Sequence, residues 1–137
     1  MTLERILYAD ARPKMKPGDV IAFSGKGHFS EIIKMATFSE VSHVGVILQT
    51  GLVSDTTGRV FNQIIESTSL HGFNGVNISR FSDRHNEYAG RMWWLPIRTN
   101  LRDDPIMYKA FYDYLFNHAK RRTPYDMKQA VTSALDL

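Results

Sequence analysis

The sequence predicts a single α+β domain in which helices pack on a small, mainly antiparallel sheet. A length of 137 residues is enough for one domain with its own core and too short for two. Hydrophobic residues make up 43% of the chain, which is typical of a globular protein. Four apolar runs have the length of strands, and three segments repeat apolar residues at helical spacing. The runs are residues 18–23, 40–49, 60–67 and 90–97, and the helical segments are residues 29–37, 104–121 and 123–137.

The first half of the chain is expected to form a strand, a helix and a two-stranded hairpin. Residues 1–12 fit either one helical turn or an edge strand, and residues 13–17 fit a loop. Gly18 and Asp19 form a turn before the first strand, and an amphipathic helix over 29–37 follows that strand. The polar turn region 51–58 lets the strand over 60–67 return antiparallel to the strand over 40–49.

The second half of the chain is expected to be mainly helical. Residues 70–75 fit a loop, 76–79 a brief extended piece and 81–88 one helical turn before the last strand. Asp104 and Pro105 are a strong helix start, because aspartate caps free amides and proline suits the first helical position. A further amphipathic helix is predicted from Thr123 to the end of the sequence.

The stretch 40–49 combines a buried strand with a histidine at its entrance. Its β-branched and bulky apolar residues suit a strand that is covered on both faces. His43, Gly45 and Ile47 share one face, and the missing side chain of Gly45 is expected to leave space beside the imidazole. Two interpretations stay open for His43, a satisfied histidine at a strand end or a base that meets a partner.

Glu66 ends an apolar run, where a carboxylate is costly unless it has a partner. Antiparallel pairing of the two strands brings Glu66 toward His43. A carboxylate that accepts a proton from one imidazole nitrogen sets the tautomer and raises the basicity of the other nitrogen. The alternative is a surface glutamate at a strand end.

Composition argues against several classes of partner. The net charge of +3 comes from two basic clusters without interleaved aromatic residues, so no nucleic acid is expected. No apolar run approaches the length of about 20 residues that spans a bilayer. Residues 1–10 do not resemble a signal peptide, which favours the cytoplasm and leaves the compartment otherwise open. The histidines are too scattered for a metal site, and no cofactor is expected; they are His28, His43, His71, His85 and His118.

Six short pieces, in this order, resemble one known family. They are Gly18-Asp19-Val20-Ile21, Ser42-His43-Val44-Gly45-Val46, Ile64-Ile65-Glu66-Ser67, Gly75-Val76, Tyr88-Ala89-Gly90-Arg91-Met92-Trp93 and Pro124-Tyr125-Asp126. The chain is similar to the circularly permuted papain-like hydrolases of the NlpC/P60 superfamily, in the group typified by the YiiX and YaeF proteins. The resemblance implies a cysteine hydrolase in which His43 matches the catalytic histidine and Glu66 the residue that orients it.

The sequence departs from this family at the nucleophile, because it contains no cysteine. In the family the cysteine opens a further helix beyond the position of Asp126, so the resemblance implies a domain whose C-terminal elements are missing here. Ser24, Ser42 and Ser67 are the candidates for a substitute nucleophile near His43. Ser24, Ser42 and Tyr125 are the candidates for a substrate groove.

Two functions follow from these expectations. The first is a thiol amidase or peptidase, acting on a peptide, a cell-wall peptide or an acylated substrate, that is inactive as this cysteine-free chain and self-associates through an exposed apolar patch. The second is a protein without catalytic activity that retains the fold and binds a peptide or lipid fragment beside His43.

Overall fold

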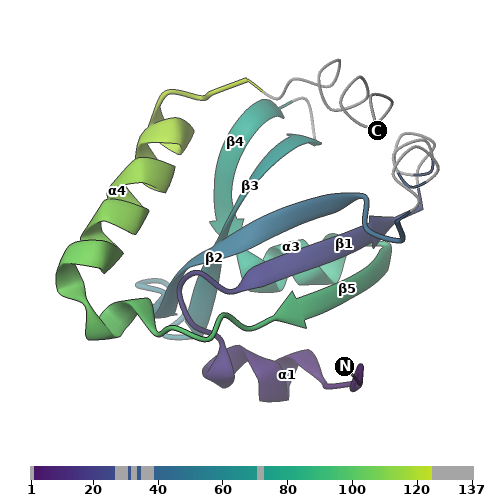
Figure 1. The fold of residues 1–137 in the computed structure, drawn as a ribbon, viewed down its shortest axis with the longest axis horizontal. Helices are drawn as coiled ribbons and strands as arrows, with labels where there is room; N and C mark the ends of the chain where they lie inside the picture. Colours follow the sequence, from purple (N-terminus) through teal and green to yellow (C-terminus); the bar gives the residue numbers. More distant parts are fainter. Residues whose placement is uncertain (1, 27–30, 32–33, 35–38, 71–72, 125–137) are drawn as a thin grey trace.

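Five strands form one antiparallel sheet in the order β4-β3-β2-β1-β5 (Figure 1). This computed structural model describes residues 2–26, 31, 34, 39–70 and 73–124. The strands are β1 Val20–Gly25, β2 His43–Val53, β3 Val60–Leu70, β4 Phe73–Arg80 and β5 Gly90–Leu95. The helices are α1 Tyr8–Ala11, α3 Phe81–Glu87 and α4 Pro105–Lys120, with short 3-10 turns η1 Arg12–Lys14 and η2 Leu101–Asp103. The predicted α+β class is confirmed, and the permuted NlpC/P60 type stays a prediction.

The hairpin of β3 and β4 is the main departure from the predicted elements. Residues 70–75 were expected to form a loop, but β3 continues to Leu70 and β4 begins at Phe73. The added part of the hairpin is rich in serine, threonine and asparagine, so it lacks the apolar alternation by which strands are detected. Gly75, with φ of +142°, lies where a Cβ atom would be 2.7 Å from the carbonyl oxygen of Thr123. The chain after α4 therefore approaches β4 closely at this glycine.

The core lies on one face of the sheet, under α1 and α3. Phe23, Ile47 and Ile64 point to this face from three adjacent strands and are fully buried. Phe81 at the start of α3 packs against them. His43 shares this face, because it lies two and four residues before Gly45 and Ile47 on the same strand. The other face is less completely covered than predicted, since Val44 is 53% exposed.

Asp19 anchors the start of β1 from a fully buried position. Its carboxylate accepts hydrogen bonds from the backbone amides of Lys16 at 2.9 Å and Ile97 at 3.0 Å, and from Trp94 Nε1 at 2.8 Å. Each of these hydrogen bonds offsets part of the free-energy cost of burying a carboxylate. The turn before β1 is thereby tied to the end of β5, on the face where His43 and Glu66 lie.

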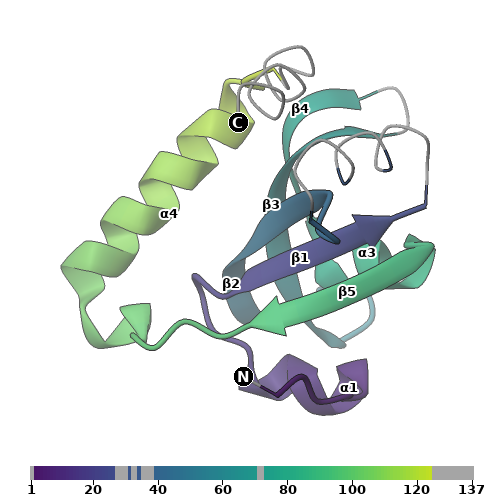
Figure 2. The same ribbon diagram turned by 45° about the vertical axis from the view of Figure 1, so that its right-hand side comes forward.

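Helix α4 starts as predicted but buries none of its side chains. Asp104 caps it by accepting hydrogen bonds from the amides of Ile106 and Met107. The helix runs along the left of the sheet in Figure 1 and stands apart from α1 and α3, which Figure 2 also shows. Among the described residues, no helix has both the length and the apolar character needed to cross a bilayer. The helix predicted after Thr123 and most of the one predicted over 29–37 lie outside the described residues.

Candidate functional site

The pairing of β2 and β3 brings His43 and Glu66 together as diagonal neighbours. Glu66 lies directly opposite Gly45, two residues along β2 from His43. The predicted space beside the imidazole is absent, because a Cβ atom on residue 45 would lie 2.7 Å from Ile64 Cδ1. Gly45 therefore makes room for the cross-strand isoleucine, and that expectation was wrong.

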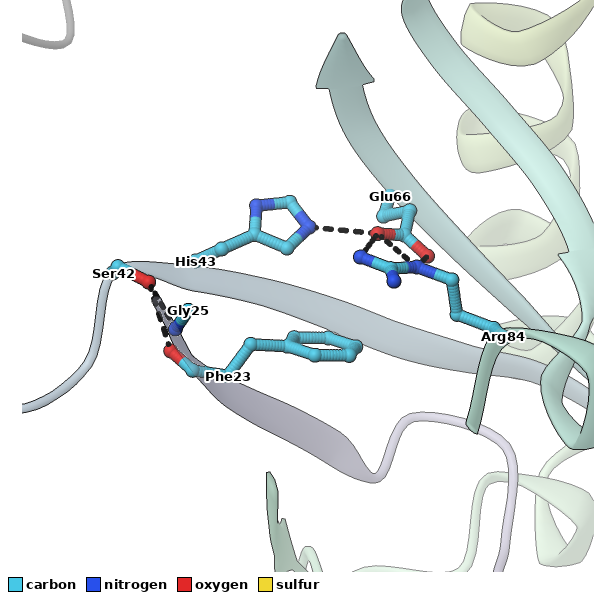
Figure 3. A network of polar contacts seen from close by, with 6 residues as sticks. All are labelled: Phe23, Gly25, Ser42, His43, Glu66 and Arg84. Carbon is cyan, nitrogen blue, oxygen red and sulfur yellow. Dashed lines mark hydrogen bonds and ion pairs between the residues drawn. The ribbon is translucent and has the colours of Figure 1, made fainter. Parts of the chain in front are cut away.

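His43 and Glu66 are joined by a hydrogen bond in a partly enclosed site. The Nε2 atom of His43 lies 2.8 Å from Oε1 of Glu66 (Figure 3). The side chain of Glu66 is 1% exposed and that of His43 is 22% exposed. The predicted contact is thus present, and the surface alternative for Glu66 does not hold.

Arg84 is a third member of the site that the sequence analysis did not single out. Its Nε donates to Glu66 Oε2 at 2.9 Å and to Oε1 at 3.1 Å, and its Nη2 donates to Oε1 at 3.0 Å. Phe81, Arg84 and Tyr88 follow one another at helical spacing, so the burial of Phe81 turns Arg84 toward the sheet. That spacing was the signal in the sequence that could have revealed it.

The pKa of Glu66 reports the balance of forces at the site. Burial alone would raise the pKa of this carboxyl, since it disfavours the charged form. Hydrogen bonds from His43 and Arg84, together with their positive charge, outweigh burial and hold the pKa of Glu66 below its ordinary value. Glu66 is consequently an ionised acceptor at neutral pH.

Aromatic rings form the floor of the site. The Phe23 ring lies beneath the side chains of His43 and Arg84 in Figure 3. Its centroid is 5.2 Å from that of the His43 ring and 4.8 Å from the guanidinium carbon of Arg84. The Tyr88 ring lies 5.0 Å from the same guanidinium carbon. Burial raises the pKa of the Tyr88 hydroxyl. These rings limit water around Arg84 and fix where its guanidinium lies.

The serine candidates have other contacts. Ser42 Oγ accepts from the amide of Gly25 at 3.0 Å and donates to the carbonyl of Phe23 at 3.3 Å, so in Figure 3 it faces β1 rather than the imidazole. Ser24 is buried and accepts from Lys34 Nζ at 3.3 Å. Ser67 follows Glu66 in β3, so its side chain points to the other face. Among the described residues, none of the three has a hydrogen bond to His43.

A surface hollow lies near Ser24, but among the described residues none of those predicted for the substrate groove lines it. A hollow of about 300 Å³ is lined by Glu31, Lys34, Ser39 and Glu40, and it adjoins Ser24 through Lys34. Tyr125 lies outside the described residues. The assignment of Ser24, Ser42 and Tyr125 to a substrate groove stays a prediction, as do the expectations that the chain binds no metal and no cofactor.

This geometry suits proton transfer at the outer nitrogen of His43. With Nε2 donating to an ionised carboxylate, the neutral imidazole carries its proton on Nε2 and leaves Nδ1 as the acceptor. Nδ1 lies on the side of the ring away from Glu66 in Figure 3, and it has no hydrogen-bond partner within the described part of the chain. A nucleophile that approached this side could lose its proton to Nδ1.

Comparison with known proteins identifies no family for this chain. No family model matches it, and no curated protein matches its sequence. The geometry of the site therefore has to support any functional proposal.

Proposed function

We propose that this chain supplies the histidine and carboxylate of a papain-like thiol hydrolase that cleaves an amide in a peptide, a cell-wall peptide or an acylated substrate. In this proposal His43 is the general base and acid, and Glu66 orients it. The observation that carries the proposal is the 2.8 Å contact between Nε2 and the buried carboxylate, which leaves Nδ1 free to act.

The chemistry requires a thiol that is not among these 137 residues. Nδ1 of His43 would accept the thiol proton, and Glu66 would stabilise the resulting imidazolium. The thiolate would add to the carbonyl carbon, and the imidazolium would return the proton to the leaving amine as the C–N bond breaks. Water would then hydrolyse the thioester and release the acid. Catalysis would therefore need a cysteine in the natural gene product outside these 137 residues.

The test is the intact mass of the natural, untagged gene product before and after treatment with iodoacetamide. The reaction is run at about pH 5.5, where an ordinary thiol with a pKa of about 8.5 hardly reacts and a thiolate paired with imidazolium does. We expect a mass above the 15.7 kDa of these residues and one rapid alkylation. His43→Ala should slow that alkylation by at least about 10-fold, whereas His118→Ala on α4 should not change it.

A second function is favoured by the absence of cysteine from the sequence. In this alternative the protein binds a peptide or lipid fragment beside His43 and performs no covalent chemistry. A natural gene product of 15.7 kDa that iodoacetamide does not modify would support the binding function and refute the hydrolase. Alkylation at equal rates in the natural protein and in His43→Ala would also refute the proposed hydrolase.

A further inference from the structure

We infer that Arg84 is a positioning residue that keeps the Glu66 carboxylate ionised and aimed at Nε2 of His43. The inference rests on the proposed role of His43 as a base, and it adds a residue to that site. Arg84 acts through Glu66, and within the described part of the chain it makes no hydrogen bond to the imidazole.

The first argument is the shape of the contact. A guanidinium presents two parallel N–H groups that match the two oxygens of a carboxylate, so the pair has one preferred orientation. Arg84 Nε contacts both oxygens and Nη2 contacts Oε1. The carboxylate plane is therefore fixed, and Oε1 is the oxygen shared with His43. A single hydrogen bond from His43 would leave the carboxylate free to rotate.

The second argument is that Arg84 is itself held in place. Its side chain is 12% exposed, and its guanidinium lies against the rings of Phe23 and Tyr88. Such contacts restrict the rotamers of a long side chain that otherwise moves freely at a surface. Phe23 on β1 and the position of Arg84 on α3 therefore fix the guanidinium. The guanidinium in turn fixes the orientation of the Glu66 carboxylate that bonds His43.

The third argument is charge. Among the described residues, the ionisable groups that interact with Glu66 are His43 from β2, Arg84 from α3 and, electrostatically, the Tyr88 hydroxyl after α3, while β1 contributes the uncharged Phe23. Arg84 is the permanent cation in this set, because a guanidinium keeps its charge whereas an imidazole that acts as a base carries none. It therefore compensates the buried carboxylate at every pH at which His43 is to act as a base.

The test compares Arg84→Met and Arg84→Lys with the natural residue in the 137-residue chain. Two NMR measurements are made on each protein: the pH midpoint of the Glu66 carboxyl carbon, and the exchange rate of the His43 Nε2 proton with water. Arg80→Met is the matched control, since Arg80 also lies over a ring, at 4.6 Å from Phe61, but has no hydrogen bond to Glu66.

We expect Arg84→Met to raise the Glu66 midpoint by about one pH unit or more and to speed the exchange of the Nε2 proton about 10-fold. Arg84→Lys should keep most of the midpoint, because the charge remains, and should still exchange faster, because the two-pronged contact is lost. If Arg84→Met does not fold, the exchange rate of the Nε2 proton in Arg84→Lys tests the inference by itself. Arg80→Met should leave both measurements unchanged.

The inference is overturned if the Arg84 variants lower the free energy of unfolding but match Arg80→Met in both NMR measurements. Arg84 would then only fasten α3 to the sheet. That outcome is separate from the test of the hydrolase, which depends on a cysteine in the natural gene product. Conversely, a natural product without a reactive thiol would refute the proposed function while the NMR comparison still reports on Arg84.

Discussion

Gly45→Ala tests how tightly β2 and β3 pack beside the site. The added methyl group would lie 2.7 Å from Ile64 Cδ1 and 3.0 Å from Cγ1, both shorter than van der Waals contact. Overpacking of this kind costs about 1–3 kcal/mol. Replacing a strand glycine by alanine returns about 0.5–1 kcal/mol of chain entropy. We expect a net loss of about 0–2.5 kcal/mol in the free energy of unfolding, with the low end reached if Ile64 rotates away.

The assay is urea unfolding of four proteins: the natural chain, Gly45→Ala, Ile64→Val and the double variant. Ile64→Val removes Cδ1 and by itself costs about 0.5–1.5 kcal/mol. In that background the alanine at 45 should cost less, because the 2.7 Å contact with Cδ1 is gone while the 3.0 Å contact with Cγ1 and the 3.3 Å contact with the Ile65 carbonyl oxygen remain. The two changes should therefore couple by about 0.5–1 kcal/mol. Equal costs of Gly45→Ala with and without Cδ1 would refute the packing described for these strands.

Two further predictions concern buried carboxylates. Asp19→Ala leaves three donors without an acceptor and should lower the free energy of unfolding by about 2–4 kcal/mol. As a control, Asp55→Ala at an exposed position should change the free energy of unfolding by less than about 0.5 kcal/mol. Equal effects of the two variants in urea unfolding would contradict the role of Asp19. The pKa of Glu66 is lower in the folded than in the unfolded protein. The ionised carboxylate therefore stabilises the fold above the unfolded pKa of about 4.3, and this contribution is lost as pH falls through the folded pKa. Glu66→Gln should flatten this acid loss of stability, measured by urea unfolding across that range, and an unchanged slope would count against it.

The sequence predicted the elements that have strong apolar patterns. The runs that became β1, β2 and β5 are apolar enough to be located, and Asp104 with Pro105 marks the start of α4. The contact of His43 with Glu66 also followed from local information, because the turn region between β2 and β3 implies an antiparallel hairpin. In such a hairpin, residues near the start of the first strand lie close to residues in the later part of the second strand, which places Glu66 diagonally across from His43.

The features that were missed depend on contacts between distant segments. Strand β4 is largely polar, so pairing with β3 rather than its own pattern defines it. Arg84 lies in a polar helical turn, and its partner on β3 is 18 residues away in the sequence. The space expected at Gly45 is filled by Ile64 from the facing strand, which a pattern along one strand does not reveal. The apolar stripe of α4 predicted a helix correctly, but periodicity does not say whether the stripe is buried.

The tautomer of His43 tests the central claim most directly. Nitrogen-15 NMR of the neutral imidazole distinguishes a proton on Nε2 from one on Nδ1. The account predicts the proton on Nε2, held by Glu66, with Nδ1 unprotonated, and a loss of this preference in Glu66→Gln. A proton on Nδ1 in the natural chain, or the same tautomer mixture in both proteins, would contradict the assignment of His43 as a base oriented by Glu66.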